Sequence, residues 1–221
     1  MLLSDVAAAV SVLELRGNPQ VEVTAVTHDS RRVVRGALFC CVPGSATDGH
    51  DHAAAAVAAG AGALLVERFL DLGDARVAQV RVASTREAMA PAAAAVYGDP
   101  SRRLAVLGVT GTNGKTTVTF LLEGMARAAG RLPGVIGTVG ARLGGAAFAG
   151  LGHTTPEAPD FQALLGRMAD AGAEVVAVEA SSHALALHRV DATWFTAACF
   201  TNLSHDHLDF HGDLDGYFAA K

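Results

Sequence analysis

A glycine-rich loop that carries a lysine stands between an apolar run and a segment whose apolar residues have helical spacing. Residues 104–110 form the apolar run. The loop consists of Gly111, Thr112, Asn113, Gly114, Lys115, Thr116 and Thr117. Backbone N–H groups in such a loop, together with the positive end of the following helix, bind phosphate. We therefore expect a nucleoside triphosphate here, with Lys115 on its β- and γ-phosphates and the Thr116 hydroxyl on Mg²⁺.

The spacing of this loop departs from the common Gly-x4-Gly-Lys-Ser/Thr pattern, because Val109 occupies the position of the first glycine. The alternative interpretation is an ordinary glycine-rich turn with an incidental lysine. The order of strand, loop and amphipathic helix favours phosphate binding over that alternative.

Two further groups of polar residues have types that suit a metal. Glu179 follows the apolar run 174–178. Its carboxylate could bind Mg²⁺, or it could only accept hydrogen bonds. The phosphate loop earlier in the chain favours the Mg²⁺-binding interpretation. Residues 205–211 contain three histidines and two aspartates, which resembles a zinc motif of metallo-hydrolases. The last histidine is one position too far from the aspartate and only ten residues follow it, so a zinc hydrolase is the weaker interpretation.

Composition and charge limit the classes of function. Hydrophobic residues make up 51% of the chain, which is enough for a sizeable buried core. The formal net charge of -5 argues against broad binding to nucleic acid. Apolar runs stay short of the roughly 20 residues that span a bilayer, and the N-terminus lacks a signal-peptide pattern. We therefore expect a cytoplasmic protein without membrane insertion. Three cysteines without a CxxC pair predict no disulfide framework.

The alternation of apolar runs and turn residues predicts an α/β protein with two domains. Turn residues at 97–101 mark the boundary, which separates an N-terminal domain at residues 1–98 from a nucleotide-binding domain at residues 99–221. Strands are predicted at residues 21–27, 37–42, 63–67, 77–82, 104–110, 134–139, 174–178 and 196–200. Helices are predicted at residues 52–59, 85–97, 118–129 and 161–168. This alternation predicts mostly parallel sheets with right-handed crossovers.

The phosphate loop resembles the ATP loop of the Mur ligases and of folylpolyglutamate synthase, which are ATP-dependent enzymes that join an amine to a carboxylate. Other segments are similar to the Mur ligases that add the third amino acid of a muramoyl peptide, namely residues 153–157, 179–185 and 200–212. The N-terminal domain of the family binds uridine diphosphate. Three segments of this chain resemble it, at residues 28–31, 36–39 and 44–50. The resemblance spans almost the whole chain. It covers the first domain and about half of the central ATPase domain of these three-domain enzymes, and not the C-terminal domain that binds the amino acid.

The resemblance implies a role for each matching residue. Contacts with the UDP-sugar peptide are implied for Ser30, Ser45, Ala46, Thr47, His153, Thr154, Thr155, Ser181 and Arg189. Two Mg²⁺ ions are implied, the first on Thr116 and Glu179 and the second on His207 and Lys221. In the family, the lysine that matches Lys221 is carbamylated by CO₂ and so becomes an anion. Catalytic roles are implied for Lys115, Glu179, His207 and Lys221.

The function implied by the resemblance is that of an ATP-dependent amide ligase in peptidoglycan precursor synthesis. ATP phosphorylates the D-Glu side-chain carboxylate of UDP-MurNAc-L-Ala-D-Glu, the amine of a diamino acid attacks the acyl phosphate, and phosphate leaves. The diamino acid is meso-diaminopimelate or L-lysine. We expect a monomer, and we expect the 221 residues alone not to complete the ligation. Another Mur-type or folylpolyglutamate-type ligase, or a non-catalytic nucleotide-binding regulator, remains an alternative.

Overall fold

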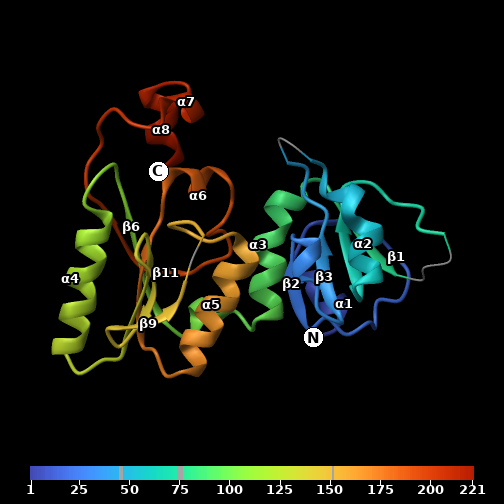
Figure 1. The fold of residues 1–221 in the computed structure, drawn as a ribbon, viewed down its shortest axis with the longest axis horizontal. Coiled ribbons are helices and arrows are strands. Elements are labelled where there is room, and N and C mark those ends of the chain that lie inside the picture. Colours follow the sequence, from blue (N-terminus) through green and yellow to red (C-terminus); the bar gives the residue numbers. More distant parts are fainter. Residues whose placement is uncertain (45–46, 74–76, 151) are drawn as a thin grey trace. The chain divides into compact units, whose positions relative to one another are not determined.

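The structure is a computed structural model that describes residues 1–44, 47–73, 77–150 and 152–221 (Figure 1). The chain divides into two compact units, Met1–Gly98 and Asp99–Lys221. Each unit contains its own sheet and its own hydrophobic core. The division falls at the turn residues that mark the boundary in the sequence.

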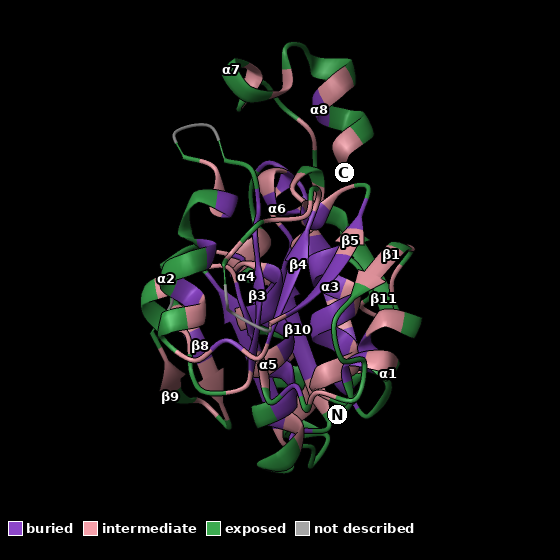
Figure 2. Ribbon diagram, turned by 90° about the vertical axis from the view of Figure 1, so that its right-hand side faces the viewer, coloured by how far each residue is buried: buried purple, intermediate pink, exposed green. Residues whose placement is uncertain are grey.

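The first unit is built on a five-stranded sheet with the order β1-β5-β4-β3-β2. Its strands are β1 (Val12–Arg16), β2 (Ala25–Thr27), β3 (Ala37–Cys40), β4 (Ala63–Val66) and β5 (Ala78–Val82). β2 to β5 pair in parallel, and β1 runs antiparallel to β5. The helices are α1 (Leu3–Ala8), α2 (Ala53–Ala58) and α3 (Thr85–Val96), with 3₁₀ helices η1 (Ser30–Arg32) and η2 (Gly49–His52). β3 and β4 are buried along their whole length, as Figure 2 shows, which explains their unbroken apolar sequences.

Helix α3 confirms the helix predicted at residues 85–97, although Pro91 lies inside it. A proline in a helix interior removes one hydrogen bond and costs about 3 kcal/mol. Two features offset this cost. The Ser84 side chain caps the helix by accepting the Glu87 N–H at 3.2 Å, and the alanine-rich face of α3 is buried. The cap and the buried face therefore let the helix continue past Pro91.

The second unit is built on a six-stranded sheet with the order β11-β6-β10-β7-β8-β9. Its strands are β6 (Ala105–Thr110), β7 (Pro133–Gly137), β8 (Gly140–Leu143), β9 (Ala146–Ala149), β10 (Val175–Glu179) and β11 (Phe195–Phe200). β11, β6, β10 and β7 are parallel neighbours, and β8 and β9 continue the sheet antiparallel. The helices are α4 (Lys115–Ala128), α5 (Ala158–Asp170), α6 (Ser182–Ala186), α7 (Leu208–His211) and α8 (Leu214–Ala220), with η3 (Pro100–Arg102). Figure 1 shows α4 and α5 on opposite sides of the sheet.

Helix α4 occupies the position predicted for it, but its buried side differs from its apolar stripe. An apolar stripe at helical spacing usually faces the core. In α4, however, Leu121 and Met125 are more than half exposed, while Thr119 and Glu123 are buried. In α5 the predicted spacing does mark the core, because Phe161 and its helical neighbours are buried.

Several elements were not predicted from the sequence. These are β1, the β8–β9 hairpin and the short helices α1, α6, α7 and α8. The strand predicted at residues 21–27 is also too long, because β2 begins only at Ala25. Short elements bury few residues and leave little periodicity to detect. Within the described residues, no helix combines the length and the hydropathy that crossing a bilayer requires.

Candidate nucleotide and metal site

The predicted phosphate loop lies between the end of β6 and the start of α4. Gly111 and Gly114 have φ angles of +135° and +86°, which residues with a side chain rarely adopt. A Cβ atom at Gly111 would lie 2.0 Å from the Thr201 hydroxyl, so the loop has no room for a side chain there. The first N–H groups of α4 have no partner within the helix and carry the positive end of its dipole. The loop can therefore hold an anion through its backbone.

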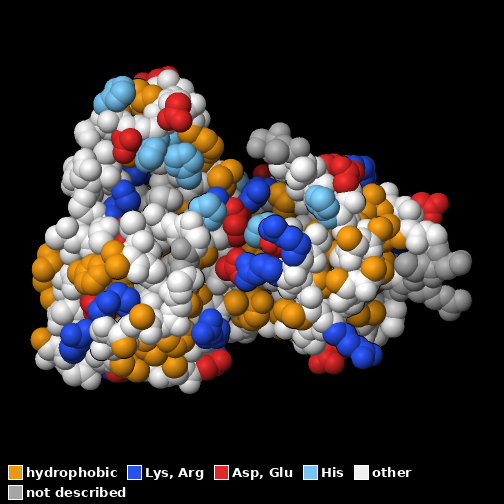
Figure 3. Space-filling view, in the orientation of Figure 1, with side chains coloured by type: hydrophobic (Ala, Val, Ile, Leu, Met, Phe, Trp, Pro, Cys, Tyr) orange, Lys and Arg blue, Asp and Glu red, His pale blue; other side chains and the backbone are white. Residues whose placement is uncertain are grey.

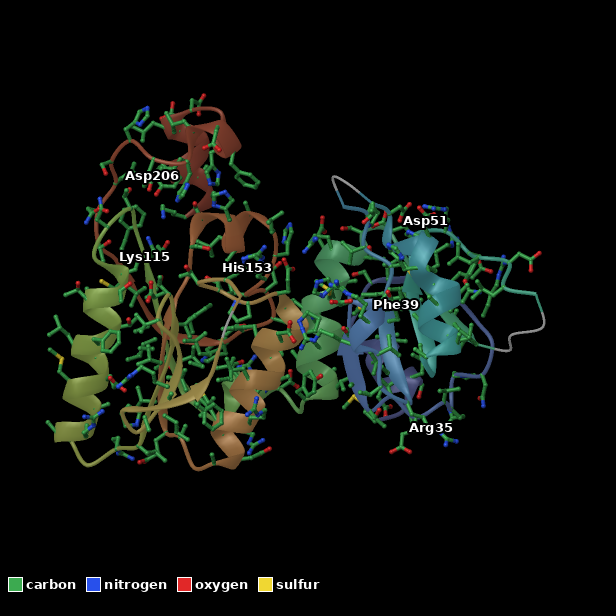
Figure 4. The ribbon with its side chains drawn as sticks, in the orientation of Figure 1. Arg35, Phe39, Asp51, Lys115, His153 and Asp206 are labelled. Atoms are coloured by element: carbon green, nitrogen blue, oxygen red, sulfur yellow. The ribbon has the colours of Figure 1, made fainter. Side chains whose placement is uncertain are left out.

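Both lysines of the chain place their ammonium groups on one backbone oxygen of this loop. Lys115 Nζ donates to Gly111 O and to Thr112 O, each at 2.9 Å. Lys221 Nζ donates to Gly111 O, also at 2.9 Å. Burial lowers the pKa of both amines, and the charge of Lys221 lowers the pKa of Lys115 further. An anion in the loop would therefore meet two amines. Figure 4 shows Lys115 at the first turn of α4, at the same end of the unit as Asp206.

Glu179, at the end of β10, is 1% exposed and accepts three hydrogen bonds from two threonines. The Thr116 hydroxyl donates to Oε2 at 3.0 Å. Thr138 donates its N–H to Oε1 at 3.1 Å and its hydroxyl to Oε2 at 3.0 Å. The structure thus brings together the two residues predicted for the first Mg²⁺. A hydroxyl and a carboxylate are the hard oxygen donors that Mg²⁺ prefers, so these side chains fit the ion.

Three of the predicted substrate residues lie directly beside Glu179. The Thr155 hydroxyl donates to Glu179 O at 2.6 Å and accepts the Ser181 N–H at 3.2 Å. The Thr154 hydroxyl is 3.1 Å from that of Thr138. The segment that precedes α5 is therefore tied to the end of β10 on the side of the phosphate loop.

Arg189 is held in place by the same segment. Its NH2 group is 2.7 Å from Glu157 Oε1, and its NH1 group donates to Thr155 O at 3.2 Å. The side chains of Arg189 and Glu157 are only 12% and 15% exposed. Among the described residues, the buried Nε of Arg189 has no hydrogen-bond partner. His153, the remaining predicted contact in this segment, is exposed.

His207 belongs to a group of aromatic side chains near the C-terminus, where Figure 3 shows several histidines. Its ring packs edge-on against His183, with 4.8 Å between the ring centroids, and lies 6.2 Å from the ring of Tyr217. The Tyr217 hydroxyl is 3.2 Å from Thr112 Oγ1, and Lys221 Nζ lies 4.6 Å from the centre of the Tyr217 ring. Tyr217 therefore links His207, Lys221 and the phosphate loop.

The zinc interpretation receives no support from the geometry. Among the residues that the structure describes, no three His, Cys, Asp or Glu side chains gather so that they could hold a metal ion. The ring of His183, which belongs to another part of the sequence, packs edge-on against His207.

The predicted UDP contacts lie in the first unit. Ser30 is the first residue of η1, and the Asp29 side chain caps this 3₁₀ helix. Thr47 is exposed, and its carbonyl oxygen accepts the Gly44 N–H at 3.0 Å. Ser45 and Ala46 lie outside the described residues.

Three residues of the site were missed by the sequence analysis: Thr138, Asn202 and Tyr217. Thr138 directly follows β7, and Asn202 follows β11 by two positions. Ligands of parallel sheets bind at the carboxyl ends of the strands, so this rule would have found both. Tyr217 reaches the loop from α8, a helix that was not predicted.

The sequence matches two protein-family models, the Mur ligase middle domain at residues 109–221 and the Mur ligase family catalytic domain at residues 22–97. It is 47% identical over 205 residues to a UDP-N-acetylmuramoyl-L-alanyl-D-glutamate–2,6-diaminopimelate ligase of Geobacillus thermodenitrificans, covering 93% of this chain and 41% of that one. It is 45% identical over 225 residues to a UDP-N-acetylmuramyl-tripeptide synthetase of Deinococcus radiodurans, covering 100% of this chain and 46% of that one. The chain therefore spans less than half the length of these relatives.

Solved structures of similar fold include a UDP-N-acetylmuramoyl-L-alanyl-D-glutamate–2,6-diaminopimelate ligase, with a TM-score of 0.80, 28% identity and coverage of 100% of this chain and 44% of that one. MurF from Acinetobacter baumannii shares the fold at a TM-score of 0.68 and 22% identity, over 100% of this chain and 45% of that one. These matches confirm the predicted α/β class with two mostly parallel sheets. Because one family model alone accounts for more than half of its residues, the chain belongs to the Mur ligase family.

Proposed function

We propose that this chain is the nucleotide-binding and muramoyl-peptide-binding part of an ATP-dependent amide ligase. The ligase extends UDP-MurNAc-L-Ala-D-Glu by a diamino acid in peptidoglycan precursor synthesis. The observation that carries the proposal is the arrangement of Lys115, Thr116 and Glu179 beside Thr155 and Arg189. It places a phosphate loop next to groups suited to a substrate carboxylate. The names of relatives support 2,6-diaminopimelate as the amino acid.

Positioning and charge are what these residues contribute to phosphoryl transfer. Lys115 would exchange its two carbonyl partners for phosphate oxygens, and α4 would add its N-terminal N–H groups. Thr116 and Glu179 would hold the first Mg²⁺, which supplies positive charge against the transferring phosphoryl group. Arg189, fixed by Glu157, would hold the substrate carboxylate in line with that group.

A second Mg²⁺ would be held by His207 and Lys221, with Lys221 carbamylated by CO₂. The position of Lys221 beside Gly111 O and near the Tyr217 ring supports this role, because it places the amine at the phosphate loop. A neutral amine reacts with CO₂, and the burial that lowers the pKa of Lys221 increases its neutral fraction. The product carboxylate would give an oxygen donor that Mg²⁺ prefers.

Binding of MgATP to the purified chain tests the nucleotide part of the proposal. We expect calorimetry to show binding, and Lys115→Ala to weaken it by roughly 10- to 150-fold, because hydrogen bonds to charged groups contribute about 1.5–3 kcal/mol. Asn18→Ala is the control, since the Asn18 side chain accepts the Gln20 N–H at an exposed position of the first unit, and the variant keeps its backbone. Equal affinity in Lys115→Ala and the wild type would reject the assignment.

Binding of UDP-MurNAc-L-Ala-D-Glu separates the ligase from its alternatives. We expect this ligand to bind. We expect Arg189→Ala to weaken the binding of UDP-MurNAc-L-Ala-D-Glu more than it weakens the binding of UDP alone. A nucleotide-binding regulator would bind MgATP and not the muramoyl peptide, and a zinc hydrolase would retain zinc and ignore ATP.

The monomeric state, the cytoplasmic location and the absence of ligation by these 221 residues stay predictions.

A further inference from the structure

The backbone of Asn113, in the middle of the phosphate loop, is hydrogen-bonded to side chains from the segment after β11. Its N–H donates to Asn202 Oδ1 at 3.0 Å, and its carbonyl oxygen accepts Asn202 Nδ2 at 3.0 Å. The same carbonyl oxygen accepts the Thr201 hydroxyl at 2.7 Å. The Asn202 amide thus pairs with both polar groups of one residue, as a neighbouring strand would. Because the Asn113 N–H is already bonded, it is not available to a phosphate in this arrangement.

The residues on the N-terminal side of Asn113 rest on the same segment. The Thr112 N–H donates to Asn202 O at 2.9 Å, and the Thr112 hydroxyl accepts the Ser204 N–H at 2.9 Å. A Cβ at Gly111 would lie 3.0 Å from the backbone N and O of Asn202. The first half of the phosphate loop is therefore seated on residues 201–204 through several contacts, and it has no freedom to shift alone.

Gly114, which follows Asn113, makes no contact of this kind in the part of the chain that the structure describes. Gly114 opens α4 with a φ angle of +86°, and an added Cβ there would meet no atom within 4 Å. The N–H groups that follow it, at the first turn of α4, have no intrahelical partner. These are the donors that a phosphate can use. Their direction depends on where the peptide of Asn113 is held.

We propose that Asn202 is a positioning residue for phosphate binding: its side chain fixes the Asn113 peptide so that the N–H groups at the start of α4 converge on the phosphates. Asn113 then serves as the anchor of the loop through its backbone and not as a phosphate donor. This inference rests on the proposed binding of nucleotide. It adds a residue outside the loop on which the affinity for phosphate depends.

The test compares Asn202→Ala with the wild type for MgATP and for inorganic tripolyphosphate, by calorimetry at a temperature where both are folded. The variant loses both hydrogen bonds that hold the Asn113 peptide, so we expect roughly tenfold weaker binding. We expect the affinity to fall by the same factor for both ligands, because the substitution weakens contacts with the phosphates and not with the nucleoside. We also expect faster amide hydrogen exchange at Asn113 in the variant. Asn18→Ala serves as the matched control.

The outcomes separate this inference from the proposed function. If the wild type binds neither MgATP nor tripolyphosphate, the proposed function fails. If the wild type binds and Asn202→Ala binds equally well while the Asn113 amide exchanges faster, the positioning role is wrong. A lower melting temperature with unchanged affinity also shows that the positioning role is wrong. Should Asn202→Ala fail to fold, Thr201→Val removes the third hydrogen bond to Asn113 O, together with the longer bond from the same hydroxyl to Thr110 O at 3.2 Å. Thr201→Val is then expected to weaken the binding of tripolyphosphate about threefold. An affinity equal to that of the wild type would overturn the proposal.

Discussion

The Glu179 carboxylate, at the end of β10, accepts hydrogen bonds from donors that follow two other strands. Thr116 follows β6 and its loop, and Thr138 follows β7. A nearly buried carboxylate would be costly without such donors. The hydrogen bonds also fix the direction of both carboxylate oxygens, which prepares the side chain for a cation before one binds.

We predict that Thr138→Val weakens the Mg²⁺ dependence of ATP binding. The variant keeps the N–H bond to Glu179 Oε1 and loses the hydroxyl's bond to Oε2 and its contact with the Thr154 hydroxyl. One hydrogen bond to a charged group predicts roughly tenfold more Mg²⁺ for half-maximal ATP binding, measured by titrating Mg²⁺ at fixed ATP. Thr138→Ser should restore the wild-type value. A Thr138→Val protein with an unchanged Mg²⁺ requirement would show that Thr138 does not orient Glu179.

A second set of residue contacts controls stability against acid in the first unit. The backbone N–H and the ring of His50, together with Arg68, hold the pKa of Asp48 well below its usual range. A lowered folded-state pKa favours folding when the carboxyl is charged. The stabilisation is therefore complete above the unfolded-state pKa of about 3.9 and is lost as the pH falls below it.

We predict that Asp48→Asn lowers the free energy of unfolding at pH 7 and makes it less dependent on pH between about 4 and 2. Denaturant unfolding followed by circular dichroism over this pH range measures both effects. Part of the slope should remain, because Arg31 also lowers the pKa of Asp29, to about 2. Asp51→Asn, at an exposed position of η2, is the control. A slope as steep in Asp48→Asn as in the wild type would contradict the prediction.

At the level of elements, β11 is the least protected strand of the second unit. It pairs with β6 along one edge, and no described strand pairs with its other edge. Its sequence, Phe-Thr-Ala-Ala-Cys-Phe, contains no charge and no proline, and all its residues after Phe195 are exposed. An open, uncharged edge of this kind is a template for pairing with another chain.

We predict that the chain, expected to be monomeric in dilute solution, self-associates through β11 at high protein concentration, and that Ala198→Lys, in the middle of this strand, reduces that self-association. A lysine on an edge strand opposes edge-to-edge pairing by charge and by hydration. Static light scattering against protein concentration should show a smaller mean mass for the variant, with a melting temperature close to that of the wild type. Lys substitution at an exposed helical position, Ala128→Lys, adds the same charge without touching the edge. If Ala128→Lys has the same effect as Ala198→Lys, net charge and not the edge explains the result.

The elements differ in how far the sequence predicted them, and the reason is physical. β3, β4 and β10 are buried almost throughout and β6 is partly buried, so their apolar runs mark them clearly. The helix α5 was recognised for the same reason. In α4 the spacing predicted the helix but not its buried side, because Glu123 is buried close to two arginines, with its Oε1 3.5 Å from the guanidinium of each. No periodicity in the sequence reveals such a pairing. The phosphate loop and Glu179 could be predicted as parts of the site from their own sequence patterns. Placing Thr138 and Asn202 in the site required knowledge of the order of the strands in the sheet.

At the scale of the whole molecule, each unit has a core of its own. Leu64 is fully buried in the core of the first unit, and Leu165 is fully buried in that of the second. Truncating either side chain leaves a cavity and costs about 2–5 kcal/mol. The single tryptophan, Trp194, belongs to the second unit, so its fluorescence reports on that unit alone.

We predict that Leu165→Ala lowers the denaturant midpoint of Trp194 fluorescence, while Leu64→Ala leaves that midpoint near the wild-type value. Circular dichroism, which follows both units, should detect the loss in each variant. This outcome is expected if the two cores unfold as separate cooperative units. Equal shifts of the fluorescence midpoint in both variants would show instead that the chain unfolds as one unit.

The pair of amines on Gly111 O has a practical consequence, because the chain contains no other lysine. Within these 221 residues, a protease that cuts only after lysine has one internal bond to cleave, between residues 115 and 116. That bond lies in the first turn of α4, where cleavage requires local opening. The rate of this single cut, read from two fragments on a gel, therefore measures how often the phosphate loop opens. The decrease of that rate when a ligand is added measures how far the ligand stabilises the closed loop.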